Sequence, residues 1–209
     1  ELGEMTQPNE YPPRRTPWVL DNGAFALWRS GQPFDGDRFA DVCERARAHD
    51  VPPDFVVCPD VVAGGLASLS LSLEWERRLR PYGFRLALVV QDGMARDDVA
   101  PVLDRFAVLF VGGSLAWKLE TMEAWADLAH EHGLECHVGR IGSRNRIMAA
   151  KRAGVDSVDS CTPLWSEANM QTFIGGLSDP CQGLLWGHLE RAPRTLQDTL
   201  RVSVQPVAQ

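Results

Sequence analysis

Short apolar runs alternate with longer amphipathic segments along most of the chain. The runs are rich in Val, Leu and Phe and carry apolar residues at nearly every position, which is typical of strands buried on both faces. They predict six strands, at residues 18–21, 55–59, 86–91, 108–111, 135–138 and 157–159.

The segments between these runs carry apolar residues at helical spacing, and several of them end in glycine. They predict helices within residues 34–50, 68–83, 95–106, 116–133 and 143–154. Strands and helices therefore alternate, as they do in a parallel sheet covered by helices. A doubly wound sheet and a (β/α)8 barrel both satisfy this alternation.

Polar residues and glycines follow nearly every predicted strand at its carboxyl end. In a (β/α)8 barrel these ends surround one mouth, where the active sites of that fold are built. A doubly wound sheet often has a GxGxxG turn after its first strand, and no such turn follows Asp21. We therefore expect an α/β fold of the TIM-barrel type. The residues concerned are Asp21, Asn22, Gly23, Asp60, Gln91, Asp92, Gly93, Gly112, Gly113, Gly139, Arg140, Asp156 and Asp159.

The number of strands leaves the barrel open to two interpretations. A full barrel needs eight strands, and the pattern predicts six. The remaining two lie in the Pro-rich start and in "QGLLWGHLE" (residues 182–190), or else the barrel is reduced or incomplete. We expect a polar, Pro-rich segment at 1–16 followed by one barrel-like catalytic domain at 17–209, because 209 residues of 44% hydrophobic composition suit one domain.

Charge and cysteine content limit the partners of the chain. The net charge of −7 argues against general nucleic-acid binding, so any such contact is local. The longest apolar runs fall short of the ~20 residues that a membrane span needs, and no signal peptide is visible. Five cysteines without a CxxC pair predict reduced thiols in the cytoplasm, and we expect neither a metal nor a cofactor.

Five short motifs occur in one order along residues 18–163. They are "DNGAF" (21–25), "CPD" (58–60), "LVVQDG" (88–93), "FVGG" (110–113) and "RAGVDSVDSCTP" (152–163). This ordered set resembles the tRNA-guanine transglycosylases and their relatives that insert 7-deazaguanines into DNA. The resemblance implies a TIM barrel that exchanges guanine for a 7-deazaguanine base such as preQ0.

The resemblance implies a role for each matching position. It makes Asp21 the acid/base residue and Asp159 the nucleophile. It places recognition of the guanine edge on Asp60 and Gln91. The remaining residues expected to contact substrate are Asn22, Gly23, Phe25, Gly112, Gly113, Arg140 and Trp165.

The chain departs from the tRNA enzymes after the nucleophile segment. Those enzymes continue with a zinc-binding C-x-C-x-x-C motif, whereas "LWSEANMQTF" follows here and the zinc subdomain is absent. The chain is therefore most similar to the short, zinc-less DNA-modifying relatives of phages and bacteria, which makes DNA the expected acceptor and tRNA a weaker one. Those relatives often carry "ADS" where this chain has Val155–Ser157, so Asp156 is an alternative nucleophile.

Carboxylates suit this chemistry for two reasons. Breaking an N-glycosidic bond gives the sugar oxocarbenium character, which a carboxylate stabilises or traps covalently. The departing purine needs a proton, and a carboxylic acid with a raised pKa supplies it. Asp159, or else Asp156, suits the first task and Asp21 the second.

Several alternatives remain open at this point. The same carboxylates serve an N-glycosidase, or base exchange on a free nucleoside or nucleotide. "VGG" and "GRIGS" instead fit phosphate turns of a (β/α)8 enzyme that acts on a phosphorylated metabolite. Asp156 alone suits a cap or a pair with Arg152, and an accessory protein or a second copy of the chain is a further expected partner. For a phage-encoded chain the compartment is the host cytoplasm.

Overall fold

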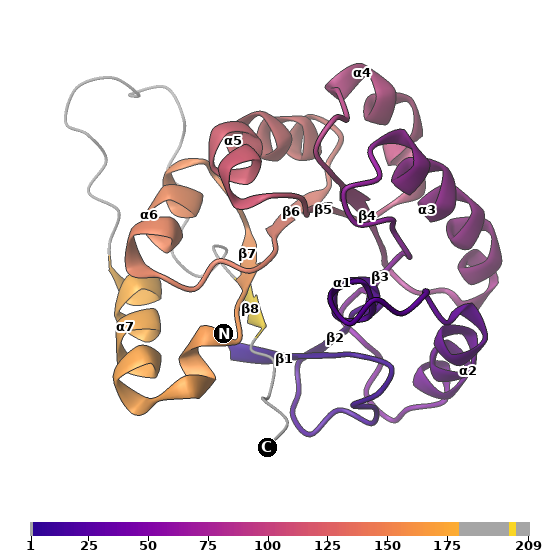
Figure 1. Ribbon diagram of the computed structural model, residues 1–209, viewed down its shortest axis with the longest axis horizontal. Coiled ribbons are helices and arrows are strands. Elements are labelled where there is room, and N and C mark those ends of the chain that lie inside the picture. Colours follow the sequence, from indigo (N-terminus) through magenta and orange to yellow (C-terminus); the bar gives the residue numbers. More distant parts are fainter. Residues whose placement is uncertain (1, 180–200, 204–209) are drawn as a thin grey trace.

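The computed structural model describes residues 2–179 and the backbone of residues 201–203. Eight parallel strands form a closed barrel in which each strand pairs with its neighbours in chain order (Figure 1). The strands are β1 (Leu2–Thr6), β2 (Trp18–Leu20), β3 (Val56–Val57), β4 (Leu86–Val90), β5 (Val108–Val111), β6 (Glu135–Val138), β7 (Ser157–Asp159) and β8 (Arg201–Ser203).

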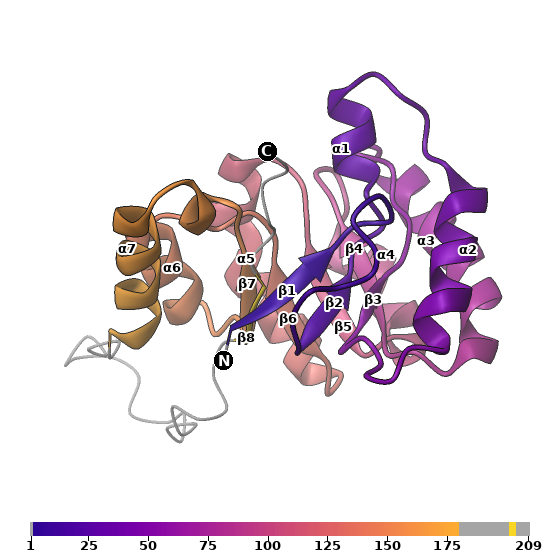
Figure 2. The same ribbon diagram turned by 90° about the horizontal axis from the view of Figure 1, so that it is seen from below.

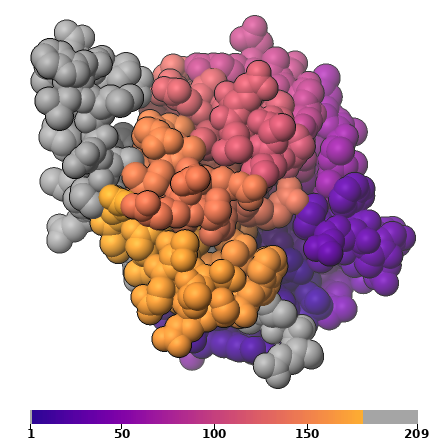
Figure 3. All heavy atoms as spheres, turned by 60° about the vertical axis from the view of Figure 1, so that its left-hand side comes forward, coloured from indigo at the N-terminus to yellow at the C-terminus, as the bar shows by residue number. Residues whose placement is uncertain are grey.

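Most of the helices surround this barrel on its outside, whereas α1 (Ala24–Arg29) lies within their ring in the view of Figure 1. The others are α2 (Gly36–Arg47), α3 (Leu66–Leu79), η1 (Arg80–Tyr82), α4 (Arg96–Val99), η2 (Ala100–Arg105), α5 (Leu115–Glu131), α6 (Arg144–Arg152), η3 (Thr162–Trp165) and α7 (Glu167–Ser178). α7 packs against α6 and η3 (Figure 3). The TIM-barrel prediction is confirmed, and the sequential order of the strands excludes the doubly wound sheet.

The core has two parts, which explains why the strands are apolar along their whole length. In β4, Ala87 and Val89 belong to the cluster inside the barrel, whereas Leu86, Leu88 and Val90 belong to the cluster that the helices cover. Successive side chains of a strand point to opposite faces, so both faces of such a strand need apolar residues.

Two strands complete the barrel beyond the six that the sequence pattern predicts. β1 lies at residues 2–6, within the segment that we expected to precede the barrel domain, and its pairing with β2 and β8 makes it part of the barrel. β8 lies at residues 201–203. The other expected position for a strand, residues 182–190, lies outside the described residues.

Two further differences concern helices. The helix expected within residues 95–106 is divided into α4 and η2, because Pro101 has no backbone N–H to continue the α-helical pattern. α1 and α7 were not predicted. α1 follows β2 directly and projects beyond the barrel on the side of the carboxyl ends of the strands (Figure 2).

Candidate active site

A cavity of about 90 Å³ lies among the carboxyl ends of the strands, which is several times the space that one water needs. It brings together nine of the twelve residues that the sequence analysis assigned to the site. These nine are Asp21, Asn22, Phe25, Asp60, Gln91, Gly112, Gly113, Arg140 and Asp159. Met5, Gln7, Val57, Val62, Val89, Phe110 and Gly139 complete the lining.

Asp21 follows β2 and is half-buried in the cavity wall. Burial, followed by the negative charges of Asp159 and Asp60, raises the pKa of Asp21 to about 7, against a smaller lowering effect of the backbone amides that follow it. A carboxyl group with this pKa exchanges its proton at neutral pH. Asp21 therefore has the property that a general acid/base needs.

Asp60 is buried, and both of its carboxylate oxygens are hydrogen-bonded. The Asn22 amide Nδ2 donates to Oδ1 at 2.8 Å, and the Gln91 amide Nε2 donates to Oδ2. Burial raises the pKa of Asp60, while these two hydrogen bonds and the charge of Arg140 oppose the rise. The two amides fix the plane of the carboxylate at the cavity wall.

Asn22 positions its neighbours. Its Nδ2 also donates to the Cys58 carbonyl at 2.9 Å, and its Oδ1 accepts from the Ala24 amide at 2.7 Å. Three protein partners thus occupy the side-chain amide. Asn22, which we expected to contact substrate, lines the cavity, and its amide also joins the ends of β2 and β3 and begins α1.

Asp159 ends β7 and is 4% exposed. Its Oδ1 accepts hydrogen bonds from the His137 Nε2 at 3.2 Å and from the Arg140 backbone N–H at 3.1 Å. Within residues 2–179, no group donates a hydrogen bond to Oδ2. One oxygen of this carboxylate is thus held by the protein, and the other is available to a ligand.

His137 is a residue of the site that the sequence analysis did not identify. Its Nδ1 shares a hydrogen bond with the Ser157 hydroxyl at 2.7 Å, and its ring stacks on Phe110 with the centroids 4.6 Å apart. These contacts orient Nε2 toward Asp159. The one available signal was a histidine within a predicted strand, between Cys136 and Val138 and directly before "VGR".

Arg140 reaches across the mouth from β6. Its Nη2 donates to the Gly113 carbonyl at 2.8 Å, and its guanidinium carbon lies 3.9 Å from the centroid of the Phe25 ring. On α1, Phe25 stacks on Trp28 with the centroids 5.8 Å apart, and Trp28 is 55% exposed. Arg29 lies over the same Phe25 ring at 6.0 Å. The rim of the cavity therefore combines aromatic rings with two guanidinium groups.

Two glycines allow backbone to approach the cavity closely. A Cβ on Gly112 would lie 3.0 Å from the Val89 side chain and 3.2 Å from the Gln91 Nε2. Gly113 has φ +73°, and a Cβ there would lie 2.9 Å from the Trp117 ring and still closer to an Asp92 carboxylate oxygen. A side chain at Gly112 would displace Val89 and Gln91, which form the cavity wall, and one at Gly113 would displace Asp92 and Trp117 behind it.

Asp156, Trp165 and Gly23 do not line this cavity. Asp156 precedes β7 at the opposite end of the barrel, where its Oδ2 accepts from the Cys136 amide and interacts with the His130 Nε2, both at 2.8 Å. The odd spacing of three residues separates it from Asp159, so it does not share the site. Trp165 lies on η3 and is 64% exposed.

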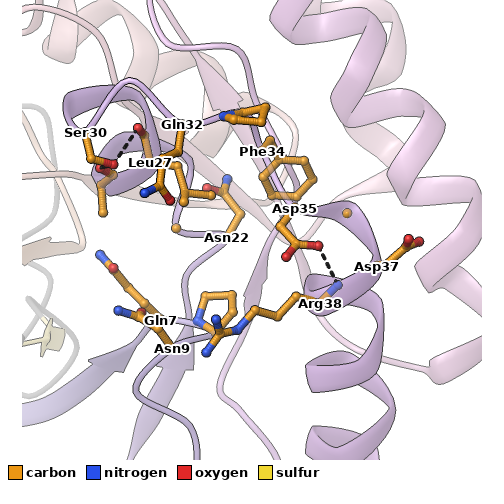
Figure 4. Close-up of a pocket in the computed structure, with 15 residues that line it drawn as sticks. Gln7, Asn9, Asn22, Leu27, Ser30, Gln32, Phe34, Asp35, Asp37 and Arg38 are labelled. Atoms are coloured by element: carbon orange, nitrogen blue, oxygen red, sulfur yellow. Dashed lines mark hydrogen bonds between the residues drawn. The ribbon is translucent and has the colours of Figure 1, made fainter.

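A wider groove of about 810 Å³ adjoins the cavity and shares Gln7 and Asn22 with it. It lies between the β1–β2 connection and the segment from α1 to α2 (Figure 4). Gly23 lines this groove. The other lining residues are Pro8, Asn9, Ala26, Leu27, Ser30, Gln32, Pro33, Phe34, Asp35, Gly36, Asp37 and Arg38.

The described residues contain no group of three or more His, Cys, Asp or Glu side chains that suits a metal ion. None of the helices in this part of the chain is long and apolar enough to cross a membrane.

No family model and no curated protein matches the chain. Among solved structures, it is similar to the Bacillus subtilis YkuI protein, which has an EAL domain and was solved with c-di-GMP and calcium. The TM-score is 0.42 and the identity 16%, over 66% of this chain and 35% of that chain.

It is also similar to type I 3-dehydroquinate dehydratase from Clostridium difficile, solved with covalently modified comenic acid. The TM-score is 0.43 and the identity 12%, over 68% of this chain and 64% of that chain. The match spans less than two thirds of each of these proteins. The chemistry of this chain is therefore interpreted from its own residues.

Proposed function

We propose that the chain exchanges bases at an N-glycosidic bond, replacing guanine in DNA by a 7-deazaguanine. The observation that carries the proposal is the pair of unlike carboxyl groups on one cavity. Burial and the nearby carboxylates raise the pKa of Asp21 to about 7, whereas Asp159 accepts two hydrogen bonds on Oδ1. Two such groups in different surroundings supply an acid/base and a nucleophile.

The reaction assigns one step to each carboxyl group. Asp159 Oδ2 attacks the anomeric carbon, and the bond between this carbon and N9 of guanine breaks. The electron pair stays on N9, which takes the proton of Asp21. The incoming base then returns its N9 proton to Asp21, and its N9 displaces Asp159 from the sugar.

Recognition of the base falls to Asp60 and Gln91. A guanine-like base presents an N–H and an exocyclic amine on one edge and a carbonyl oxygen beside them. Asp60 supplies acceptors for that edge and Gln91 supplies a donor for the carbonyl. Both side chains line the cavity and are already oriented by their mutual hydrogen bond.

DNA as the acceptor is supported by the rim of the cavity. Arg140 and Arg29 lie near the ring of Phe25, and Trp28 is exposed beside it. Aromatic rings beside arginines suit a single nucleic-acid strand, because bases stack on the rings and phosphates bind guanidinium. A local contact of this kind is compatible with a chain of net charge −7.

Base exchange on a free nucleoside is the second candidate, and the wider groove favours it. Gln7 and Asn9 lie across this groove from Ser30 and Gln32 (Figure 4). Neutral amides and hydroxyls suit a sugar or a base, and the two carboxylates of Asp35 and Asp37 outnumber the one guanidinium, that of Arg38, in the lining of the groove.

The test offers duplex DNA, single-stranded DNA, tRNA, deoxyguanosine and dGMP to the protein with a labelled 7-deazaguanine base. Asp159→Asn and Asp21→Asn are compared with Asp156→Asn, a matched control that lies directly before β7 and outside the cavity. We expect the wild-type protein and Asp156→Asn to incorporate the labelled base into DNA, and Asp159→Asn and Asp21→Asn to incorporate none.

Other outcomes decide between the alternatives. Incorporation into deoxyguanosine or dGMP alone would replace DNA by a free acceptor. Release of guanine without incorporation would identify an N-glycosidase. If the protein neither incorporates the labelled base nor releases guanine from any of these substrates, base exchange is refuted.

A further inference from the structure

Lys118 is a buried cation that the reaction described above does not use. It lies on α5, is 1% exposed, and its Nζ donates to the Gly139 carbonyl oxygen. The sequence contains two lysines, Lys118 and Lys151, beside many arginines. An ammonium group out of contact with water needs compensation by a partner of opposite charge.

The carbonyl that Lys118 binds belongs to the same peptide group as the amide that binds Asp159. This peptide joins Gly139 to Arg140, and the Arg140 N–H donates to Asp159 Oδ1 at 3.1 Å. In a trans peptide the C=O and the N–H point in opposite directions. One planar unit thus links the ammonium on one side to the carboxylate on the other.

The charges around Lys118 act on its ammonium in both directions. Burial, followed by the positive charge of Arg140, lowers the pKa of Lys118 to about 8. Arg146 acts in the same direction, and Asp159 and Asp92 oppose it. A cation bound to a carbonyl polarises the peptide and strengthens the hydrogen bond that its N–H donates.

The local backbone is built for the same contact. Arg140 has φ +59°, a left-handed conformation that costs a non-glycine residue conformational energy. At Gly139, a Cβ would lie 2.8 Å from Phe110 and 3.2 Å from Asp159 Oδ1. The peptide therefore lies against Asp159 only because position 139 has no side chain.

We propose that Lys118 is a positioning residue for Asp159. Its ammonium fixes and polarises the peptide between Gly139 and Arg140, whose N–H holds Oδ1 and directs Oδ2 into the cavity. The inference rests on the proposed function in so far as Asp159 acts on a sugar. The chain of hydrogen bonds itself is tested without any assay of activity.

The test compares Lys118→Met and Lys118→Gln with Lys151→Met in ¹⁵N-labelled protein. Lys151 is a matched control, because its Nζ likewise donates to backbone carbonyls. These are the carbonyls of Leu177 and Asp179, which do not contact Asp159. We expect the Arg140 amide proton to move upfield and to exchange faster in Lys118→Met. Lys118→Gln keeps a donor without the charge, so its shift is smaller.

An Arg140 amide that is unchanged in a folded Lys118→Met protein would overturn the proposal, as would an equal change in Lys151→Met. If the spectrum shows Lys118→Met to be unfolded, the same comparison is decided by Lys118→Gln. In the exchange assay, kcat falls about tenfold in Lys118→Met, the loss expected for one charge-assisted hydrogen bond. KM for the free base is unchanged, because Asp60 and Gln91 keep their contacts.

An equal fall of kcat in Lys151→Met would also contradict the positioning role. If the wild-type protein exchanges no base, the proposed function fails, while the Arg140 amide still decides the role of Lys118.

Discussion

Residues of one type differ in chemistry here because their surroundings differ. Asp21, Asp60 and Asp159 line one cavity, yet among them side-chain amides donate to Asp60 and a histidine is bonded to Asp159. Asp156, three residues from Asp159, interacts with His130 at the other end of the barrel. Position relative to the strand end thus decides which carboxylates act together.

Asp60→Asn is expected to weaken binding of the base. Asn22 and Gln91 both donate to Asp60, so an amide there places one N–H against another and removes the acceptor that guanine needs. KM for the free base should rise roughly 10- to 100-fold with a smaller change in kcat. Steady-state kinetics measures this, with the exposed, ion-paired Asp41→Asn as the control. An unchanged KM would contradict the role of Asp60.

At the scale of elements, short connections bring the polar residues to the mouth. α1 follows β2 after a three-residue connection and projects beyond the barrel (Figure 2). It carries Phe25, which lines the cavity, and Trp28, which stacks on Phe25. The turn after β5 carries Gly112 and Gly113 beside the Gln91 side chain.

Trp28→Ala tests the part of the cavity rim that α1 supplies. Loss of a stacking ring should raise Kd for single-stranded DNA by the equivalent of about 1–3 kcal/mol. The melting temperature should hardly change, because Trp28 is 55% exposed. Fluorescence anisotropy measures Kd, and Leu119→Ala, an exposed apolar residue on α5, is the control. Equal affinities of the two variants would argue against stacking on Trp28.

Gly113→Ala tests the turn after β5. Gly113 and Gly133 both have a left-handed φ, +73° and +74°, but only at Gly113 would a Cβ meet other atoms. Gly133→Ala should cost about 1–2 kcal/mol of unfolding free energy from backbone strain alone. Gly113→Ala should cost clearly more, as urea denaturation would show. Equal losses of unfolding free energy in the two variants would mean that the turn rearranges to accommodate the added methyl group.

For the whole molecule, the closed barrel concentrates negative charge at one mouth. Three carboxyl groups share a cavity, and burial raises the pKa of Asp21 and Asp60. The folded protein therefore binds protons more readily than the unfolded chain above the ordinary pKa of aspartate. Linkage then requires the unfolding free energy contributed by these groups to fall as the pH rises toward their folded pKa.

Asp21→Asn is expected to remove part of this pH dependence. The pKa of Asp21 rises from 3.8 to about 7, so its unfavourable contribution grows between those values and is complete above about pH 7. The variant should gain up to about 4 kcal/mol of stability relative to wild type at about pH 8, and hardly any at about pH 4. Urea denaturation at both pH values measures this, with Asp41→Asn as the control. An equal difference at both pH values would contradict the raised pKa.

The hydrophobic pattern, together with the polar residues at the ends of the apolar runs, was enough to predict the barrel class. Strands buried on both faces need uninterrupted apolar runs, and these runs, with polar residues at their carboxyl ends, are local features of the sequence. β5, β6 and β7 have the predicted bounds. Most of the cavity lining also follows from this rule, because parallel strands all end on one side.

Only the tertiary structure decided which residues complete the site. β1 is a short strand of mixed composition whose place depends on its pairing with β2 and β8, so no local periodicity identifies it. His137 contacts Asp159, and Lys118 contacts the Gly139 carbonyl. The two residues are 22 positions apart in the sequence in the first pair and 21 in the second. A contact between residues far apart in the chain produces no periodic pattern along the sequence. Burial, which raises the pKa of Asp21, likewise exists only once the chain is folded.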